Sequence, residues 1–191
     1  MHRVERLGSG HLGRRAALGG GSDNLTVWRA LGDIDDGRAN AMPMHRVGKY
    51  YFEIEVQRAA QEVCPGIRGI HRRGEMMMRL CGYGGGNGWW SDDRGGSSGM
   101  GGPGPALETG DVVGFAVNLD AQLVRIFING KESSFSNGGK FPTTVDEHYY
   151  VFPFVELGLN SAVRARFDGE FAYPPPAGYQ TWTCKDWISE D

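Results

Sequence analysis

Strict alternation of apolar and polar residues recurs along this sequence, and it restricts the fold more than any other feature. Successive side chains of a β-strand point to opposite faces, so alternation with a period of two predicts a half-buried strand. In the first such segment Phe52, Ile54 and Val56 are expected to face the core. The alternating segments are 51–56, 113–119 and 162–167.

Other segments add strands without alternating. The run 124–128 is followed by Asn129-Gly130, and Asn-Gly after a β-branched run is a strong hairpin signal because both turn positions need positive φ. Residues 152–157 are apolar enough for a buried strand, and 76–80 favours a strand over a helical turn. No segment has a convincing helical period. Many short strands separated by turns predict an all-β fold, an antiparallel two-sheet sandwich or barrel.

Length, charge and glycine content limit the class of protein. A chain of 191 residues is enough for one domain with a full hydrophobic core. The net charge of −3 argues against a dedicated nucleic-acid binder, which usually carries a strongly basic face. Many of the 31 glycines lie in 82–88 and 95–104, where they predict turns and long loops.

The sequence contains no recognisable catalytic, metal or cofactor site. Its three cysteines, Cys64, Cys81 and Cys184, have no CxxC spacing, and we expect them to be reduced thiols. No histidine lies at metal-ligand spacing from another histidine or a cysteine. Two segments, 8–13 and 99–104, match GxGxxG by letter but lack the strand and helix that make it a nucleotide site. We therefore predict a protein that is not an enzyme.

Neither a membrane-spanning segment nor a secretory signal is visible, which predicts an intracellular protein, cytoplasmic or nuclear. Residues 1–22 are rich in glycine and arginine and are expected to form an N-terminal arm, with organelle import as a weaker alternative. The single domain is predicted to span 23–183, followed by a tail at 184–191.

Five motifs in a fixed order resemble those of SPRY domains. The Gly48–Val56 segment resembles the opening strand of the family, and Gly110–Phe115 its Gly-Asp-apolar strand. The remaining three are the Asn-Gly hairpin at 126–131, the last core strands at 152–155 and 163–167, and the closing segment at 171–175. The resemblance covers about residues 24–182 and implies two antiparallel sheets packed as in concanavalin-like lectins, with no catalysis and no cofactor.

Different segments of the sequence resemble different subtypes of SPRY domain. Residues 80–86 are similar to SPRY domains of a DEAD-box RNA helicase and a nuclear ribonucleoprotein, whereas 25–27 and the Pro-Pro ending are similar to a histone-methyltransferase scaffold subunit. The family's third strand usually reads Arg-apolar-Gly-Trp, but here it reads Ile67-Arg68-Gly69-Ile70. Gly84 stands where some members carry an arginine, so the basic peptide pocket of the scaffold subunit is not expected here.

SPRY domains use loops at one end of the sandwich to hold a peptide or a partner's surface. The resemblance therefore implies a non-catalytic protein–protein interaction module, a small subunit or adaptor that docks into a larger assembly. An RNA-associated accessory protein using arginine-rich loops and the arm is the alternative, and no membrane or small-molecule partner is expected. The candidate partner-binding residues, all expected in loops, are Arg38, Arg68, Tyr83, Trp89 and Trp90.

The Trp89-Trp90 pair has two possible interpretations. Adjacent strand residues face opposite sides, so one tryptophan is expected to pack inward while the other lies near the surface as an interface anchor. Alternatively, both residues cap the end of the sandwich.

Overall fold

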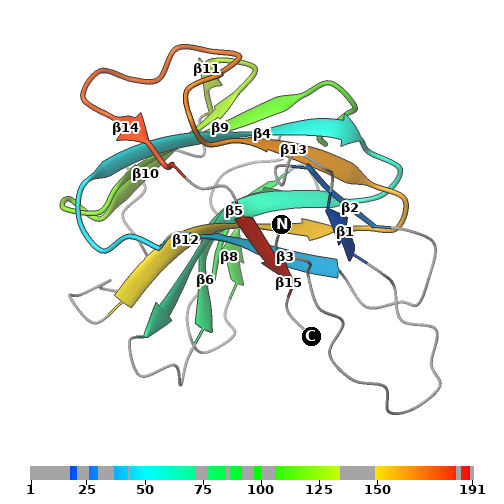
Figure 1. Ribbon diagram of the computed structural model, residues 1–191, viewed down its shortest axis with the longest axis horizontal. Helices are drawn as coiled ribbons and strands as arrows, with labels where there is room; N and C mark the ends of the chain where they lie inside the picture. The colour runs from blue at the N-terminus through cyan, green and yellow to red at the C-terminus, as the bar shows by residue number, and fades with distance from the viewer. Residues whose placement is uncertain are drawn as a thin grey trace.

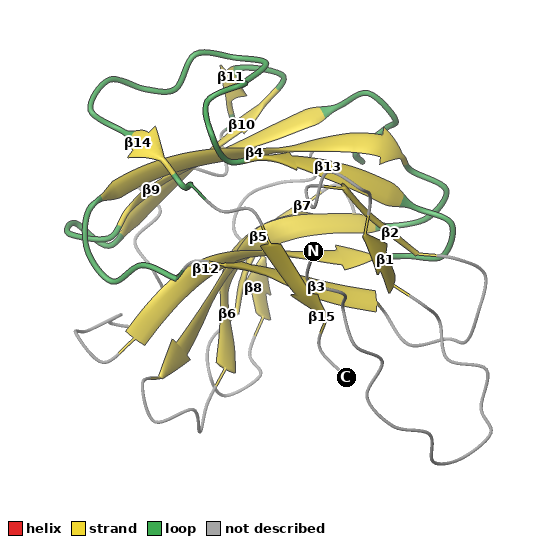
Figure 2. Ribbon diagram, in the orientation of Figure 1, coloured by secondary structure: helices red, strands yellow, loops and turns green. Residues whose placement is uncertain are grey.

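The protein is built from two facing β-sheets. The computed structural model describes residues 18–20, 26–29, 37–42, 44–71, 77–84, 87–91, 97–99, 106–133, 149–183 and 186–189. Every regular element in these ranges is a strand, and the strands form two layers (Figure 2). The predicted all-β antiparallel sandwich is confirmed.

Sheet A, the upper layer in Figure 1, has the strand order β1-β2-β13-β4-β9-β10-β11, and β14 also pairs with β4. All of its pairings are antiparallel except that between β14 and β4. Its strands are β1 (Leu18–Gly20), β2 (Thr26–Arg29), β4 (Lys49–Arg58), β9 (Val112–Asn118), β10 (Leu123–Ile128), β11 (Lys131–Glu132), β13 (Ala162–Arg166) and β14 (Gln180–Thr181).

Sheet B, the lower layer, has the order β15-β3-β12-β5-β6-β7-β8, with antiparallel pairing throughout. Its strands are β3 (Gly37–Met42), β5 (Val63–His71), β6 (Met77–Gly84), β7 (Asn87–Ser91), β8 (Ser97–Gly99), β12 (Tyr149–Leu157) and β15 (Asp186–Ser189). The strand expected at 76–80 is confirmed over 77–80, which belong to β6, and residue 76 lies outside the described residues.

The core lies between the sheets and follows the alternation of the sequence. Phe52 of β4 and Phe115 of β9 are both fully buried, and their rings stack with centroids 5.0 Å apart. In β13, Val163 and Ala165 are buried while the two arginines face outward, as the pattern predicts. The other predicted inward residues, all buried in the core, are Ile54, Val56, Val113, Val117 and Leu119.

The predicted hairpin joins β10 to β11. Asn129 and Gly130 have φ angles of 50° and 77°, the left-handed values that such a turn requires. The Asn129 side chain also accepts a hydrogen bond from the Val112 N–H (2.9 Å) and donates one to Asp111 (2.8 Å). The turn is thereby fixed to the start of β9.

Two short strands lie outside the span predicted for the domain. β1 falls within the predicted arm and pairs with β2, while β15 falls within the predicted tail and pairs with β3. Strands of three and four residues are too short to show a recognisable alternation, so the sequence pattern does not reveal them.

Candidate functional site

All five candidate residues lie in strands of sheet B, not in the loops where the sequence placed them. Arg38 is in β3, Arg68 in β5 and Tyr83 in β6, while Trp89 and Trp90 are in β7. Glycine-rich segments suggested loops, but β6 and β7 pair directly through Tyr83 opposite Gly88 and Gly84 opposite Asn87. The structure describes the side chain only for Arg68; the contact roles of all five residues stay predictions.

The strand register brings most of these positions toward one end of sheet B. Arg38 lies opposite Glu156, which lies opposite Cys64 near the start of β5. Two residues further along β5, Gly66 lies opposite Gly82, the neighbour of Tyr83. Positions separated by up to about a third of the domain in sequence therefore converge where β3 and β5 begin and β6 ends.

The same register separates the two tryptophan positions between the faces of the sheet. Phe154, Gly66, Gly82 and Trp89 form one row across four neighbouring strands. Residues directly opposite each other in an antiparallel sheet share a face. Since the core contains Val151 and Val155, the row of Phe154 belongs to the outer face of sheet B, and the position of Trp90 belongs to the inner face.

Arg68 is buried on this outer face. Its side chain is 5% exposed, and one guanidinium nitrogen lies 3.7 Å from a carboxylate oxygen of Glu156, itself a buried residue. The guanidinium also lies over the ring of Phe154, 4.7 Å from the centroid. Arg68 thus forms part of the support beneath the candidate surface and does not offer an exposed charge.

The outer face of sheet A is covered by a segment of the chain itself. Residues 168–179, which we call the covering loop, leave β13 and arch over this sheet before returning as β14 (Figure 1). The chain before and after the covering loop is joined by a hydrogen bond from the Thr183 N–H to the Phe167 carbonyl (3.1 Å). A compact surface loop whose two ends lie close together is typical of an Ω-loop.

Glu53 holds the covering loop in place. This carboxylate points away from the core yet is fully buried, and it accepts hydrogen bonds from the Ala172 N–H (2.6 Å) and the Tyr173 N–H (3.1 Å). It also accepts one from the Tyr51 hydroxyl (3.0 Å). Burial, together with the charge of Glu53, raises the pKa of Tyr51, so this hydroxyl remains a donor.

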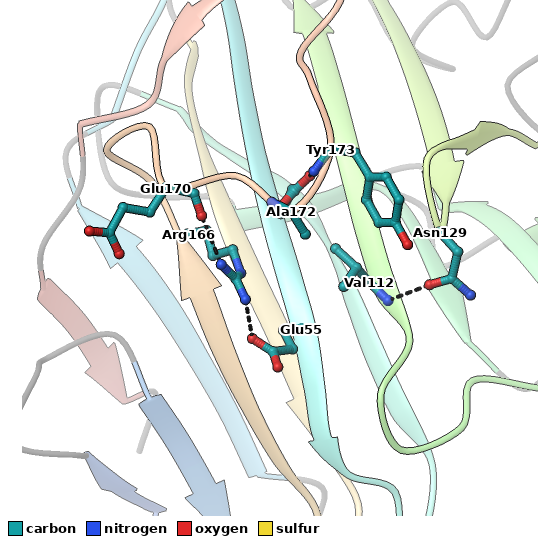
Figure 3. A network of polar contacts seen from close by, with 8 residues as sticks. Glu55, Val112, Asn129, Arg166, Glu170, Ala172 and Tyr173 are labelled. Atoms are coloured by element: carbon teal, nitrogen blue, oxygen red, sulfur yellow. Dashed lines mark hydrogen bonds and ion pairs between the residues drawn. The ribbon is translucent and has the colours of Figure 1, made fainter.

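A second anchor lies beside Glu53. Arg166 of β13 donates to Glu55 (2.7 Å) and to the backbone carbonyl of Glu170 in the covering loop (2.8 Å), and Figure 3 shows its guanidinium between the two. In the same view Tyr173 lies beside Asn129 of the hairpin. The sequence does not reveal this closed face, because alternation only predicts that Tyr51 and Glu53 point away from the core.

Hydrogen bonds join two loops at the end of the sandwich beside Arg38. In the loop between β4 and β5, the Gln61 N–H donates to the Ser161 hydroxyl (3.0 Å), and this hydroxyl donates back to the Gln61 carbonyl (3.1 Å). The Gly158 N–H also donates to the Glu62 carbonyl (2.7 Å). A Cβ at Gly158 would clash with Gln61, so the close approach of the two loops requires glycine there.

Within the described ranges, no group of three or more His, Cys, Asp or Glu side chains could hold a metal ion. The same part of the chain contains no helix long and apolar enough to cross a membrane. Cys64, the cysteine whose side chain is described, is buried.

The comparisons with known proteins identify the fold. The crystal structure of the SPRY domain of human HERC1 superimposes with a TM-score of 0.50 and 14% sequence identity, covering 75% of this chain and 89% of that one. No family model matches the sequence. No curated protein sequence matches it either. The SPRY-type sandwich that the motifs suggested is therefore shown by the structure, and its subtype stays open.

Proposed function

We propose that this protein is a non-catalytic protein-interaction module that binds its partner through the outer face of sheet B, at the end where β3 and β5 begin. SPRY domains are generally protein-interaction modules. We further propose that it acts as a small subunit or adaptor of a larger intracellular assembly.

The arrangement of the candidate positions in sheet B carries the proposal. The outer face of sheet A is occupied by the covering loop, which Glu53 fixes by two backbone hydrogen bonds. Sheet B presents the converging positions Arg38 and Trp89 on this face, at an end whose loops are joined through Gln61 and Ser161. Binding residues on a rigid scaffold are typical of interaction sites.

The buried pair under this surface supports the same assignment. Glu156 lies opposite Arg38 in the register and pairs with Arg68, so a buried charge pair underlies the candidate surface. Removing one partner of a buried pair leaves the other charge without compensation and costs about 3–5 kcal/mol of stability. Arg68 should therefore be left intact in binding experiments, and the tryptophan positions should be changed instead.

Alanine substitution of the two tryptophans tests the proposal. Trp89→Ala should leave the melting temperature close to that of the wild type and weaken partner binding by about thirtyfold, as expected for an aromatic hot spot of about 2 kcal/mol. Trp90→Ala, at an inner-face position, should cost about 3–5 kcal/mol of folding stability. Lys131→Ala, at an exposed position in sheet A, is the matched control and should change neither.

The partner would first be isolated by cross-linking the protein in cells, purifying the complex and identifying its components by mass spectrometry. Affinity of the purified partner for each variant would then be measured by calorimetry. Wild-type affinity in a folded Trp89→Ala variant, or loss of affinity in Lys131→Ala, would contradict the proposed surface.

RNA association is the second candidate, supported by the arginines of the N-terminal arm and of 68–73. Phosphate contacts release counterions, so binding of this kind should weaken steeply as salt is raised. We expect only weak RNA binding that disappears near physiological salt. Tight, salt-resistant binding by a chain lacking 1–22 would favour RNA over a protein partner.

A further inference from the structure

Three consecutive prolines, Pro174, Pro175 and Pro176, lie in the covering loop. The sequence pattern marks them only as the end of a strand region, since proline cannot donate to a β-ladder. The proposed binding surface on sheet B leaves them unused, because they lie over the opposite sheet.

The proline segment is held at both of its ends. On the N-terminal side, Ala172 and Tyr173 donate their backbone N–H groups to Glu53. On the C-terminal side, the Tyr179 N–H donates to the Pro176 carbonyl (3.3 Å), which closes a turn. The ring of Tyr173 packs so closely on Gly130 that a Cβ there would clash with it. The prolines therefore form a short bridge between fixed points.

Exposure along this bridge has a spacing of three residues. Tyr173 and Pro176 are half-buried, whereas Pro174 and Pro175 between them are exposed. A polyproline II helix has three residues per turn, so one of its faces would lie on the sheet and two would face solvent. Tyr173, Pro174 and Pro175 each precede a proline, which restricts them further to extended or polyproline II conformations.

We propose that Pro174 and Pro175 form a docking segment for a second protein, one whose proline-binding groove is lined by aromatic side chains. Grooves of this kind, in SH3, WW and EVH1 domains, bind polyproline II segments whose conformation is already restricted. Here the fold adds a further restriction, because Glu53 and the turn at Tyr179 order the segment before any partner arrives. Preorganisation of this kind reduces the entropic cost of association.

The segment does not depend on the proposed function. It lies on the outer face of sheet A, and the proposed surface lies on the outer face of sheet B, so each can be occupied without the other. A chain with both would connect two proteins on opposite sides of the sandwich.

The test measures binding of the full chain to a panel of purified WW, SH3 and EVH1 domains by calorimetry. At least one domain should bind the wild type, and Pro174→Ala/Pro175→Ala should weaken that binding at least about tenfold. Asp168→Ala changes an exposed residue of the same loop outside the prolines and should bind as the wild type does. Melting temperatures of both variants establish that the loop change leaves the fold intact.

Isotope-labelled wild-type protein gives a second measurement that needs no variant. When this protein is titrated with the domain that binds in the panel, the NMR signals of the Tyr173 and Ala177 backbone amides should shift. The signals of Gln61 and Ser161 should stay unchanged. Failure of every domain to bind, or binding that the double proline variant retains, would overturn the proposal. So would a domain that binds a free peptide of residues 169–180 but not the folded chain, because the loop would then hide the segment.

Discussion

Glu53 illustrates how much a single side chain can contribute when the alternating pattern places it away from the core. A carboxylate at such a position would ordinarily face water. Here it is fully buried and satisfied by three donors, the Tyr51 hydroxyl and the N–H groups of Ala172 and Tyr173. Arg68 on sheet B is a second charged residue buried on an outer face. The sequence predicts the face on which these residues lie, but their burial depends on segments distant in the chain.

Glu53→Gln tests this role at the scale of one residue. Glutamine keeps the shape but replaces one acceptor oxygen with an NH₂ group, so a buried N–H donor loses its partner. The free energy of unfolding should fall by about 2 kcal/mol in urea denaturation. Glu55→Gln, which weakens a partly exposed pair with Arg166, is the control and should cost no more than about 1 kcal/mol. Equal losses in the two variants would show that Glu53 does not anchor the loop.

Among the elements, the β10–β11 hairpin and the covering loop fix each other. The hairpin is visible in the sequence because Asn-Gly is a local signal, and its positive φ angles agree. Its contact with Tyr173, more than 40 residues further along, is not visible, since no local pattern encodes a long-range fold-back. The same reason explains why the candidate site was expected in loops: glycine-rich segments signal turns locally, whereas the pairing of β6 with β7 decides that they are strands.

Two glycine substitutions separate turn strain from this long-range contact. Gly110→Ala introduces a Cβ at a φ of 98° with no other atom within 4 Å, so it should cost about 1–2 kcal/mol from backbone strain alone. Gly130→Ala at a φ of 77° should cost about 1–3 kcal/mol more, because the added methyl group meets the Tyr173 ring. Urea denaturation measures both. A Gly130 variant no less stable than the Gly110 variant would mean that Tyr173 does not pack on the hairpin.

At the scale of the whole molecule, one aromatic cluster joins the two sheets near β14. His45 pairs its backbone with Val151 of sheet B (2.8 and 2.7 Å), and its ring stacks on Tyr50 of sheet A with centroids 3.9 Å apart. Its Nε2 atom lies 3.3 Å from the carbonyl of the fully buried Trp182. Trp182 lies in the chain between β14 of sheet A and β15 of sheet B. The cluster therefore lies near the point where the chain leaves sheet A for sheet B.

Acidification should weaken this connection. Burial lowers the pKa of His45, and the hydrogen bond to the Trp182 carbonyl only partly opposes it. The unfolded chain therefore binds a proton more readily than the folded protein as pH falls below about 6.5. The free energy of unfolding should decline from that pH downward until the folded pKa is passed. His45→Gln should lack this component, and identical pH profiles for wild type and variant would contradict it.

We propose that sheet B, and not sheet A, carries the partner surface. Amide hydrogen exchange of the free protein and of its purified native complex distinguishes the two sheets, because exchange reports protection strand by strand. We expect new protection in the complex at 83–90 and in the first residues of β3, with β4 and β9 unchanged. New protection confined to sheet A, or to the opposite end of the sandwich at 46–48 and 120–122, would contradict it.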